Sequence, residues 1–284
     1  MGCKLPDAIV PSGIALKTVE KNTVAEVNNV YRCEGKQNGR PISFYLKVSR
    51  NGKRNMGNEY RALELLRERG LPVPRVLWSG EGPQEYMALE EVRGTVLREL
   101  LNPKSESYSR HLKTRYLRKY GEALARIHSV DVDWQPQKRS NFYDFLGEQR
   151  LPDLRYRELV IWLEANPISD RDYCFVHGDL NTANVIFSRG EVSGLLDWEY
   201  AGKGWREYDL AWILRAERTY LNTDEERNAV LEGYSSVASY DPEALRWCEV
   251  MNYLHVAYLS RDRMPGYEEF ALEKGREISF KGFE

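Results

Sequence analysis

The chain has 284 residues, of which 42% are apolar and 30% are charged, and its 41 basic and 43 acidic side chains leave a formal net charge of −2. This composition is typical of a globular protein with one large domain or two small ones. The balanced charge argues against a general nucleic-acid binder, which usually carries a basic excess. No apolar stretch of the sequence approaches the roughly 18 residues of a membrane-spanning helix, so no membrane partner is expected.

Four cysteines are far apart in the sequence: Cys3, Cys33, Cys174 and Cys248. They form no CxxC pair, so the pattern indicates neither a zinc site nor a redox dithiol, and we expect reduced thiols in a cytoplasmic protein. The start Met1-Gly2-Cys3 resembles an acylation signal, but Pro6 occupies the position where myristoylation requires Ser or Thr.

The first ninety residues are expected to form mainly strands, with one helix. A short strand is expected at 30–34 and an alternating strand at 42–48. The residues between them, 35–39, favour a turn, so the pattern predicts a hairpin with one buried and one polar face. A helix is expected over 58–69, because apolar side chains recur there on one stripe. Gly70 then ends this helix.

A second hairpin is expected from strands at 76–79 and 85–89. Beyond these strands the chain becomes mostly helical, apart from two short apolar strands within 175–198. The sequence therefore predicts an α+β fold with a small β-rich lobe at 1–92 and a larger, mostly helical lobe at 93–284.

The strongest chemical signal is the run His177-Gly-Asp-Leu-Asn-Thr-Ala-Asn184, which two short strands and Asp197 follow. If those strands pair as a hairpin, Asn184 at the start of the first lies near Asp197 after the second. Asp179 lies on the loop just before them. Magnesium prefers oxygen ligands and is usually held by one or two protein side chains plus phosphate oxygens. We therefore assign Asn184 and Asp197 to magnesium, and Asp179 to the acceptor hydroxyl as general base.

Each of these polar residues, taken singly, could be an ordinary turn or capping residue, because Asp and Asn favour such positions. Their order and spacing together favour phosphoryl transfer. The pattern Asp-x₄-Asn, with a second Asp thirteen residues after the Asn, is that of the protein-kinase catalytic and metal loops. Two differences stand out: His-Gly-Asp replaces His-Arg-Asp, and Trp-Glu follows Asp197 where protein kinases have Phe-Gly.

With these motifs the sequence resembles the aminoglycoside phosphotransferase and choline kinase superfamily, whose members share the protein-kinase fold but phosphorylate small molecules. The matching segments extend over most of the chain: 30–32, 45–47, 58–62, 71–75, 87–94, 123–128, 177–184 and 195–201. The resemblance implies a bilobal protein-kinase-like fold that uses ATP or GTP with Mg²⁺.

The resemblance also implies roles for residues outside the catalytic loop. Lys47 would contact the α- and β-phosphates, and Glu59 would pair with Lys47 and hold it in place. His177 would brace the catalytic loop without reacting. The hinge would bond the adenine through backbone groups of three residues: Glu90, Glu91 and Val92.

One segment departs from the kinase pattern. Protein kinases usually cover the phosphates with a glycine-rich loop, but the corresponding stretch at 22–29 contains no glycine. Asn181 also occupies a position where relatives commonly carry His. Without glycine, the sequence does not specify how closely the backbone of this segment approaches the phosphates.

The acceptor side offers a weaker pattern. Glu199, Tyr200 and Glu207 follow Asp197 closely in the sequence, and carboxylates with an aromatic face suit a cation. We expect transfer of the γ-phosphate to a hydroxyl of a small, amine-bearing molecule. An aminoglycoside-type antibiotic is favoured, which would make the protein a resistance enzyme. A choline- or thiamine-type metabolic kinase, an unusual protein kinase and a nucleotide-binding pseudokinase are the alternatives, and the oligomeric state is left open.

Overall fold

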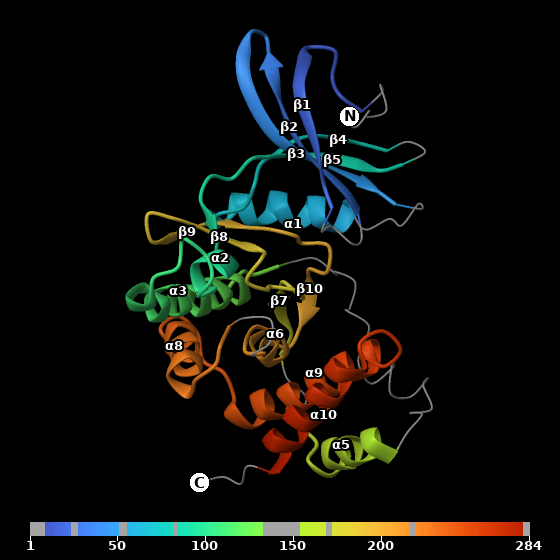
Figure 1. The fold of residues 1–284 in the computed structure, drawn as a ribbon, viewed down its shortest axis with the longest axis vertical. Helices are drawn as coiled ribbons and strands as arrows, with labels where there is room; N and C mark the ends of the chain where they lie inside the picture. Colours follow the sequence, from blue (N-terminus) through green and yellow to red (C-terminus); the bar gives the residue numbers. More distant parts are fainter. Residues whose placement is uncertain are drawn as a thin grey trace. The chain divides into compact units, whose positions relative to one another are not determined.

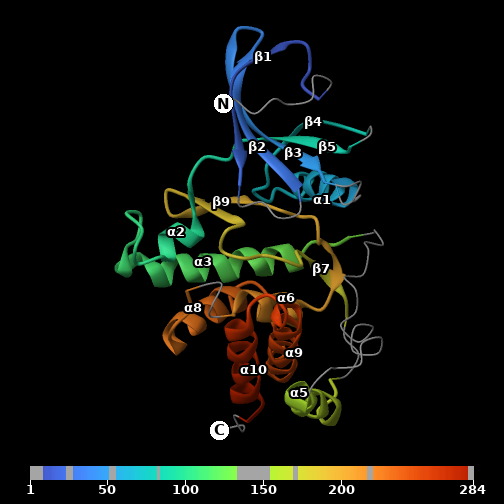
Figure 2. The same ribbon diagram turned by 45° about the vertical axis from the view of Figure 1, so that its right-hand side comes forward.

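A computed structural model describes residues 9–23, 28–50, 56–81, 84–132, 154–168, 172–215 and 220–280. The chain divides into two compact units. The first unit comprises Met1–Thr95 and Ile186–Tyr200, and the second comprises Val96–Val185 and Ala201–Glu284. Figures 1 and 2 show both units as ribbons. The prediction of functional domains at 1–92 and 93–284 stays a prediction.

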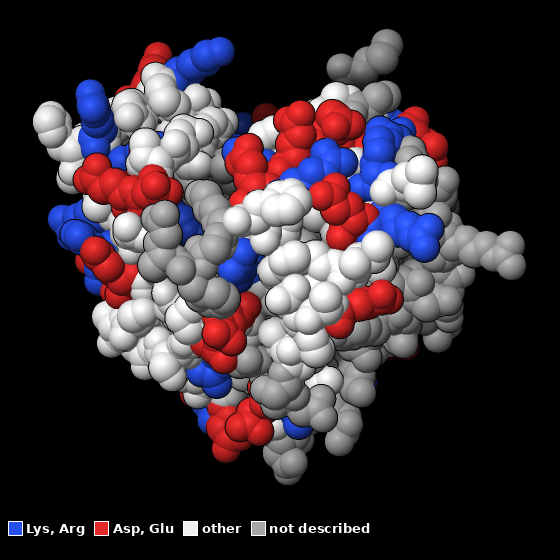
Figure 3. All heavy atoms as spheres, turned by 90° about the horizontal axis from the view of Figure 1, so that it is seen from below, with Lys and Arg blue, Asp and Glu red and all other residues white. Residues whose placement is uncertain are grey.

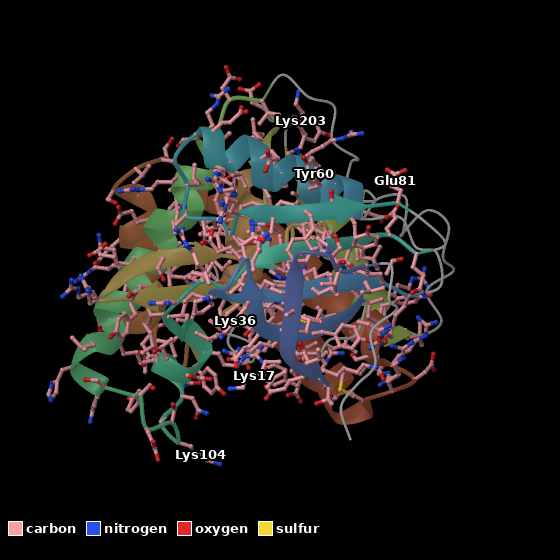
Figure 4. All side chains as sticks on the ribbon, turned by 90° about the horizontal axis from the view of Figure 1, so that it is seen from above. Lys17, Lys36, Tyr60, Glu81, Lys104 and Lys203 are labelled. Carbon is pink, nitrogen blue, oxygen red and sulfur yellow. The ribbon has the colours of Figure 1, made fainter. Side chains whose placement is uncertain are left out.

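The first unit is built on a five-stranded antiparallel sheet of order β1-β2-β3-β5-β4. Its strands are β1 (Ile14–Asn22), β2 (Asn28–Gln37), β3 (Arg40–Ser49), β4 (Val76–Gly80) and β5 (Tyr86–Glu90). The predicted hairpins are confirmed, and β1 adds an edge strand that the sequence did not single out. Lys17 and Lys36 lie exposed on the neighbouring strands β1 and β2 (Figure 4).

The turn between β2 and β3 is shorter than predicted. Only Asn38 and Gly39 make it, both with positive φ (51° and 76°), because β2 continues to Gln37. A two-residue hairpin turn of type I′ needs left-handed backbone at both central positions, and the pair Asn-Gly supplies it at low cost. Along β3 the alternation is as expected, since Phe44, Leu46 and Val48 are buried.

The core of the first unit combines these β3 side chains with residues from its other strands. Trp78 on β4 packs edge-on against Phe44, with ring centroids 4.8 Å apart, and its indole N–H donates to the Ile9 carbonyl at 3.0 Å. Helix α1 (Met56–Glu68) covers one face of the sheet (Figure 1). The predicted helix is thus confirmed, and Gly70 ends it with φ 75° while Leu71 N donates to the Leu66 carbonyl.

A second β-hairpin belongs mostly to the first unit. Strands β8 (Val185–Ser188) and β9 (Glu191–Leu195) neighbour each other in a sheet of order β6-β8-β9, where β6 is Thr95–Val96. The hairpin is attached to the segment before β4 and to the segment after β5. Leu195 N donates to the Pro72 carbonyl at 2.7 Å, and Ser193 Oγ donates to the Arg93 carbonyl at 3.2 Å. Residues just after β9 are therefore held in the same unit as β3 and α1.

The second unit is mainly helical. Its helices are α2 (Leu97–Leu101), α3 (Arg110–His128), α5 (Leu154–Ala165), α6 (Arg206–Ile213), α8 (Asp224–Ser235), α9 (Pro242–Ser260) and α10 (Pro265–Phe280). Strands β7 (Cys174–Val176) and β10 (Gly202–Gly204) pair antiparallel. Helix α9 lies beside α10, and α3 lies beside α8 (Figures 1 and 2).

Helices α3 and α8 approach each other unusually closely, because glycine stands at both contacts. A Cβ at Gly121 would lie 2.0 Å from the Val230 carbonyl oxygen, and one at Gly233 would lie 1.9 Å from that of Arg118. On the face in Figure 3, acidic and basic side chains are interspersed, as the balanced charge leads one to expect. None of the described helices has the length and apolar character to cross a membrane.

Candidate active site

Lys47 is the centre of a buried charge cluster in the first unit. Its Nζ lies 2.6 Å from Glu59 Oε1 and 2.8 Å from Asp197 Oδ1. The lysine and glutamate side chains are 12% and 1% exposed, whereas that of Asp197 is 38% exposed. The structure therefore brings together the predicted phosphate-binding lysine, its predicted helix partner and one predicted metal ligand.

The local sequence explains this convergence. Lys47 alternates with the buried Leu46 and Val48 on β3, so it points to the opposite face of the strand. Glu59 stands in the first turn of α1, on the same stripe as the buried Leu63 and Leu66. A carboxylate at that end of a helix is also favoured by the helix dipole.

The ammonium of Lys47 stays protonated in this setting. Burial opposes its charge, but the carboxylates of Glu59 and Asp197 outweigh burial and raise its pKa above the ordinary lysine value. A buried cation held by two anions is suited to contact phosphate oxygens, because Lys binds phosphate as a point charge.

The turn after β9 is fixed by its neighbours in the first unit. Asp197 has left-handed backbone with φ 67°, and the next residue, Trp198, is fully buried with its indole N–H donating to the Leu195 carbonyl at 2.9 Å. Glu199 is also buried. Its carboxylate accepts from Asn28 Nδ2 at 3.4 Å, and its carbonyl accepts from Asn58 Nδ2 at 3.1 Å.

The predicted hinge follows β5. Glu90 N donates to the Arg75 carbonyl at 2.9 Å, and the Glu90 carboxylate lies 3.3 Å from Arg75 Nε. Glu91 accepts from Arg32 Nε at 2.8 Å. These bonds tie Glu90 to Arg75 before β4 and Glu91 to Arg32 on β2, and the assignment of Glu90, Glu91 and Val92 to the adenine stays a prediction.

The predicted catalytic loop at 177–184, in the second unit, is anchored by Asp209 on α6. This carboxylate is fully buried and accepts from the backbone N–H of His177 at 2.7 Å and of Gly178 at 2.9 Å. His128 at the end of α3 lies 3.4 Å from the same carboxylate and 2.7 Å from the Tyr234 hydroxyl. Asp209 thereby ties the loop to helices α3 and α8.

Asp179 is held at several points in this loop. Its N–H donates to His177 Nδ1 at 3.2 Å, and its carbonyl accepts from Asn184 Nδ2 at 2.9 Å. Its carboxylate Oδ1 accepts from the indole N–H of Trp212 at 2.8 Å. The buried hydroxyl of Tyr120 donates to the next carbonyl, that of Leu180, at 2.7 Å.

Tyr120 keeps its proton in this environment. Burial first, and the carboxylates of Asp179 and Asp209 next, raise its pKa well above the ordinary tyrosine value. A protonated hydroxyl is needed for the bond to the Leu180 carbonyl, so this bond between Tyr120 and the loop does not change with pH in the neutral range.

The structure thus groups the predicted residues in two sets. Lys47, Glu59 and Asp197 meet in the first unit, whereas Asp179 and Asn184 share the catalytic loop of the second. Of the three predicted substrate residues, Glu199 is buried beside Asn28, Glu207 is buried and accepts from Asp241 N at 3.1 Å, and Tyr200 is 39% exposed. Their assignment to a substrate stays a prediction.

Sequence reasoning assigned no site role to several residues of these networks, among them Tyr120, His128, Asp209 and Trp212. The available signal for Asp209 was its position in a helix directly before the apolar residues Leu210 and Ala211, where an unpaired buried charge would be costly. Asn28 lies within the stretch at 22–29 that lacks glycine, of which residues 24–27 lie outside the described structure.

Replacing Asp209 with asparagine is expected to lower the free energy of unfolding by about 1.5–3 kcal/mol, because charge-assisted bonds to the loop N–H groups are lost. Urea unfolding would measure this. Asp262→Asn is the matched control, since that side chain is 81% exposed. Equal stability of the two variants would show that Asp209 does not anchor the loop.

The chemistry of Asn184 and Asp197 fits magnesium. Both offer the carboxylate or amide oxygens that this ion prefers. The amide nitrogen of Asn184 donates to the Asp179 carbonyl at 2.9 Å, so the oxygen is the atom of this amide that could bind a metal. Among the described residues, His, Cys, Asp and Glu side chains form no group of three or more that could hold a metal, so a site made only of such ligands is not indicated there.

Comparison with known proteins identifies relatives of this chain. The family model described as phosphotransferase enzyme family matches residues 22–248. An aminoglycoside 3'-phosphotransferase of Enterococcus faecalis is 24% identical over 222 residues, which are 69% of this chain and 78% of that protein. A homoserine kinase of Pseudomonas aeruginosa is 27% identical over 219 residues, 70% of this chain and 67% of the kinase.

A solved structure shares the fold. A thermostable mutant of aminoglycoside phosphotransferase APH(4)-Ia, in ternary complex with ADP and hygromycin B, superposes with a TM-score of 0.66. The match covers 95% of this chain and 96% of the other at 18% identity. The predicted α+β kinase-like fold is confirmed, and so is the predicted resemblance. The chain belongs to the phosphotransferase enzyme family.

Proposed function

We propose that the protein transfers the γ-phosphate of ATP, with magnesium, to a hydroxyl of a small, amine-bearing molecule. The observation that carries the proposal is the buried Lys47, held between Glu59 and Asp197. Burying a cation among carboxylates costs desolvation energy. Such an arrangement is therefore expected where it binds a charged ligand or fixes a structure. Membership of a phosphotransferase family makes the triphosphate the fitting ligand.

The nucleotide roles follow from this cluster. Lys47 would bind α- and β-phosphate oxygens while Glu59 keeps its ammonium in place. Asn184 directly precedes β8 and Asp197 follows β9, and these strands are neighbours in their sheet, which supports a shared magnesium. Bound magnesium would neutralise charge on the β- and γ-phosphates. The hinge residues would bond the adenine through their backbone.

Asp179 is the proposed general base. Its carboxylate would orient the acceptor hydroxyl and take its proton as the oxygen–phosphorus bond forms. The bond between the γ-phosphorus and the bridging oxygen breaks, and ADP leaves. The bonds from Trp212 and the loop hold the base in one place, and such positioning is a main source of rate in phosphoryl transfer.

The acceptor class rests on the relatives. One acts on aminoglycosides by name, one is a homoserine kinase, and the structural neighbour was solved with hygromycin B. The molecules in all three names carry both an amine and a hydroxyl group. We favour an aminoglycoside-type antibiotic, and hence a resistance enzyme of the cytoplasm. Tyr200, which is 39% exposed, is the predicted substrate residue most accessible to such a cation.

The test is a panel of acceptors with the purified protein. ADP release with Mg²⁺-ATP should accelerate at least tenfold with one class among aminoglycosides, choline, thiamine and homoserine, since a bound acceptor places its hydroxyl for attack. Transfer should be confirmed by phosphorus NMR of the product. Acceleration by choline, thiamine or homoserine alone would remove the antibiotic assignment. Nucleotide binding without transfer to any acceptor would favour the pseudokinase alternative.

A further inference from the structure

We propose that Trp212 is a positioning residue that holds the carboxylate of Asp179 in its working orientation. The proposal rests on the proposed function, in which Asp179 is the base. The carrying observation is the 2.8 Å bond from the Trp212 indole N–H to Asp179 Oδ1. The two residues stand 33 positions apart, so the fold and not the local sequence creates this contact.

The indole of Trp212 is held by two residues, one on α6 and one just after it. Tyr208, one turn before it on α6, stacks on the ring with centroids 6.3 Å apart and planes 21° apart. Arg215, one turn after it, places its guanidinium 3.7 Å from the ring centroid and is only 3% exposed. An aromatic partner and a cation therefore limit the rotation of Trp212.

The same helix carries the loop's other anchor. Asp209, three residues before Trp212, binds the backbone of the loop at His177 and Gly178. Helix α6 therefore fixes the loop backbone through Asp209 and the reactive side chain through Trp212. Residues three apart on a helix share one face, which explains how a single helix serves both contacts.

The chemistry of indole suits this role. Its N–H is a donor only and exchanges no proton with a carboxylate at ordinary pH. It can therefore orient the base without competing for the proton that the base must accept. A hydroxyl or imidazole at this position would offer a second site for that proton.

Trp212→Phe tests the proposal, because it keeps an aromatic ring on α6 and removes the donor. With Mg²⁺-ATP and the best acceptor of the panel, kcat should fall about 10- to 100-fold while the KM for ATP stays within about twofold. Trp162→Phe on α5 is the matched control and should leave both constants unchanged. An unchanged kcat in Trp212→Phe would overturn the positioning role.

A second measurement is independent of turnover. The seven tryptophans give seven indole N–H signals in a ¹H–¹⁵N spectrum. The signal that Trp212→Phe removes should be the one that Asp179→Ala shifts most. If a different signal shifts, the contact does not exist in solution and the proposal fails. If the wild type transfers phosphate to no acceptor, the proposed function fails, while this spectrum still decides whether Trp212 binds Asp179.

Discussion

Asp179→Ala is expected to lower turnover by about 10²- to 10⁴-fold, because the acceptor hydroxyl then loses the group that orients it and takes its proton. Nucleotide affinity should stay close to that of the wild type, since Asp179 contacts the loop and Trp212 but belongs to no predicted phosphate contact. Single-turnover kinetics would measure the first effect and isothermal titration with Mg²⁺-ADP the second.

A matched control separates catalysis from surface charge. Asp172 lies exposed a few residues before the same loop, so Asp172→Ala removes one carboxylate near the loop without touching it. Its turnover should equal that of the wild type. Near-normal turnover in Asp179→Ala would refute the base assignment, and parallel losses in both variants would point to a general electrostatic effect.

Asp197→Ala is expected to remove the part of nucleotide affinity that depends on magnesium, a loss of at least about 100-fold. The reason is direct: the substitution deletes a proposed magnesium ligand. It also deprives Lys47 of the carboxylate oxygen 2.8 Å away, although Glu59 still holds the ammonium. Titration of ADP with and without Mg²⁺ measures the difference.

The control for Asp197 lies in the same unit. Glu81 is exposed beyond the end of β4 (Figure 4), and Glu81→Ala should keep the full magnesium effect. If Asp197→Ala retained it as well, the ligand role would have to pass to another oxygen. Circular dichroism of both variants would exclude unfolding as the cause of any loss.

The local periodicity of apolar residues in the sequence predicted much of the fold. The alternation along β3 put Lys47 on the polar face of its strand, and the family resemblance paired it with Glu59 on α1. The structure brings the two side chains within 2.6 Å. Strand β1 was missed because its burial alternates only over residues 14–18 and Ile14 is its one buried residue. A half-exposed edge strand gives little period to detect.

The networks beneath the loop lay beyond sequence reasoning. Asp209 binds backbone groups 31 and 32 positions away, and such a pairing leaves no local pattern. Closeness in sequence to Asp197 suggested Glu207 as a substrate residue, and that assignment stays a prediction. The structure adds one contact that the sequence does not specify, because the Glu207 carboxylate accepts from Asp241 N just before α9.

The glycine contacts between α3 and α8 restrict how this protein can change over time. Gly121 and Gly233 leave no room for even a methyl group beside the opposing carbonyls. Because α3 ends in His128, which touches Asp209, any mutation that wedges these helices apart would also disturb the support of the catalytic loop. The spacing of this helix pair and the position of the loop are therefore coupled.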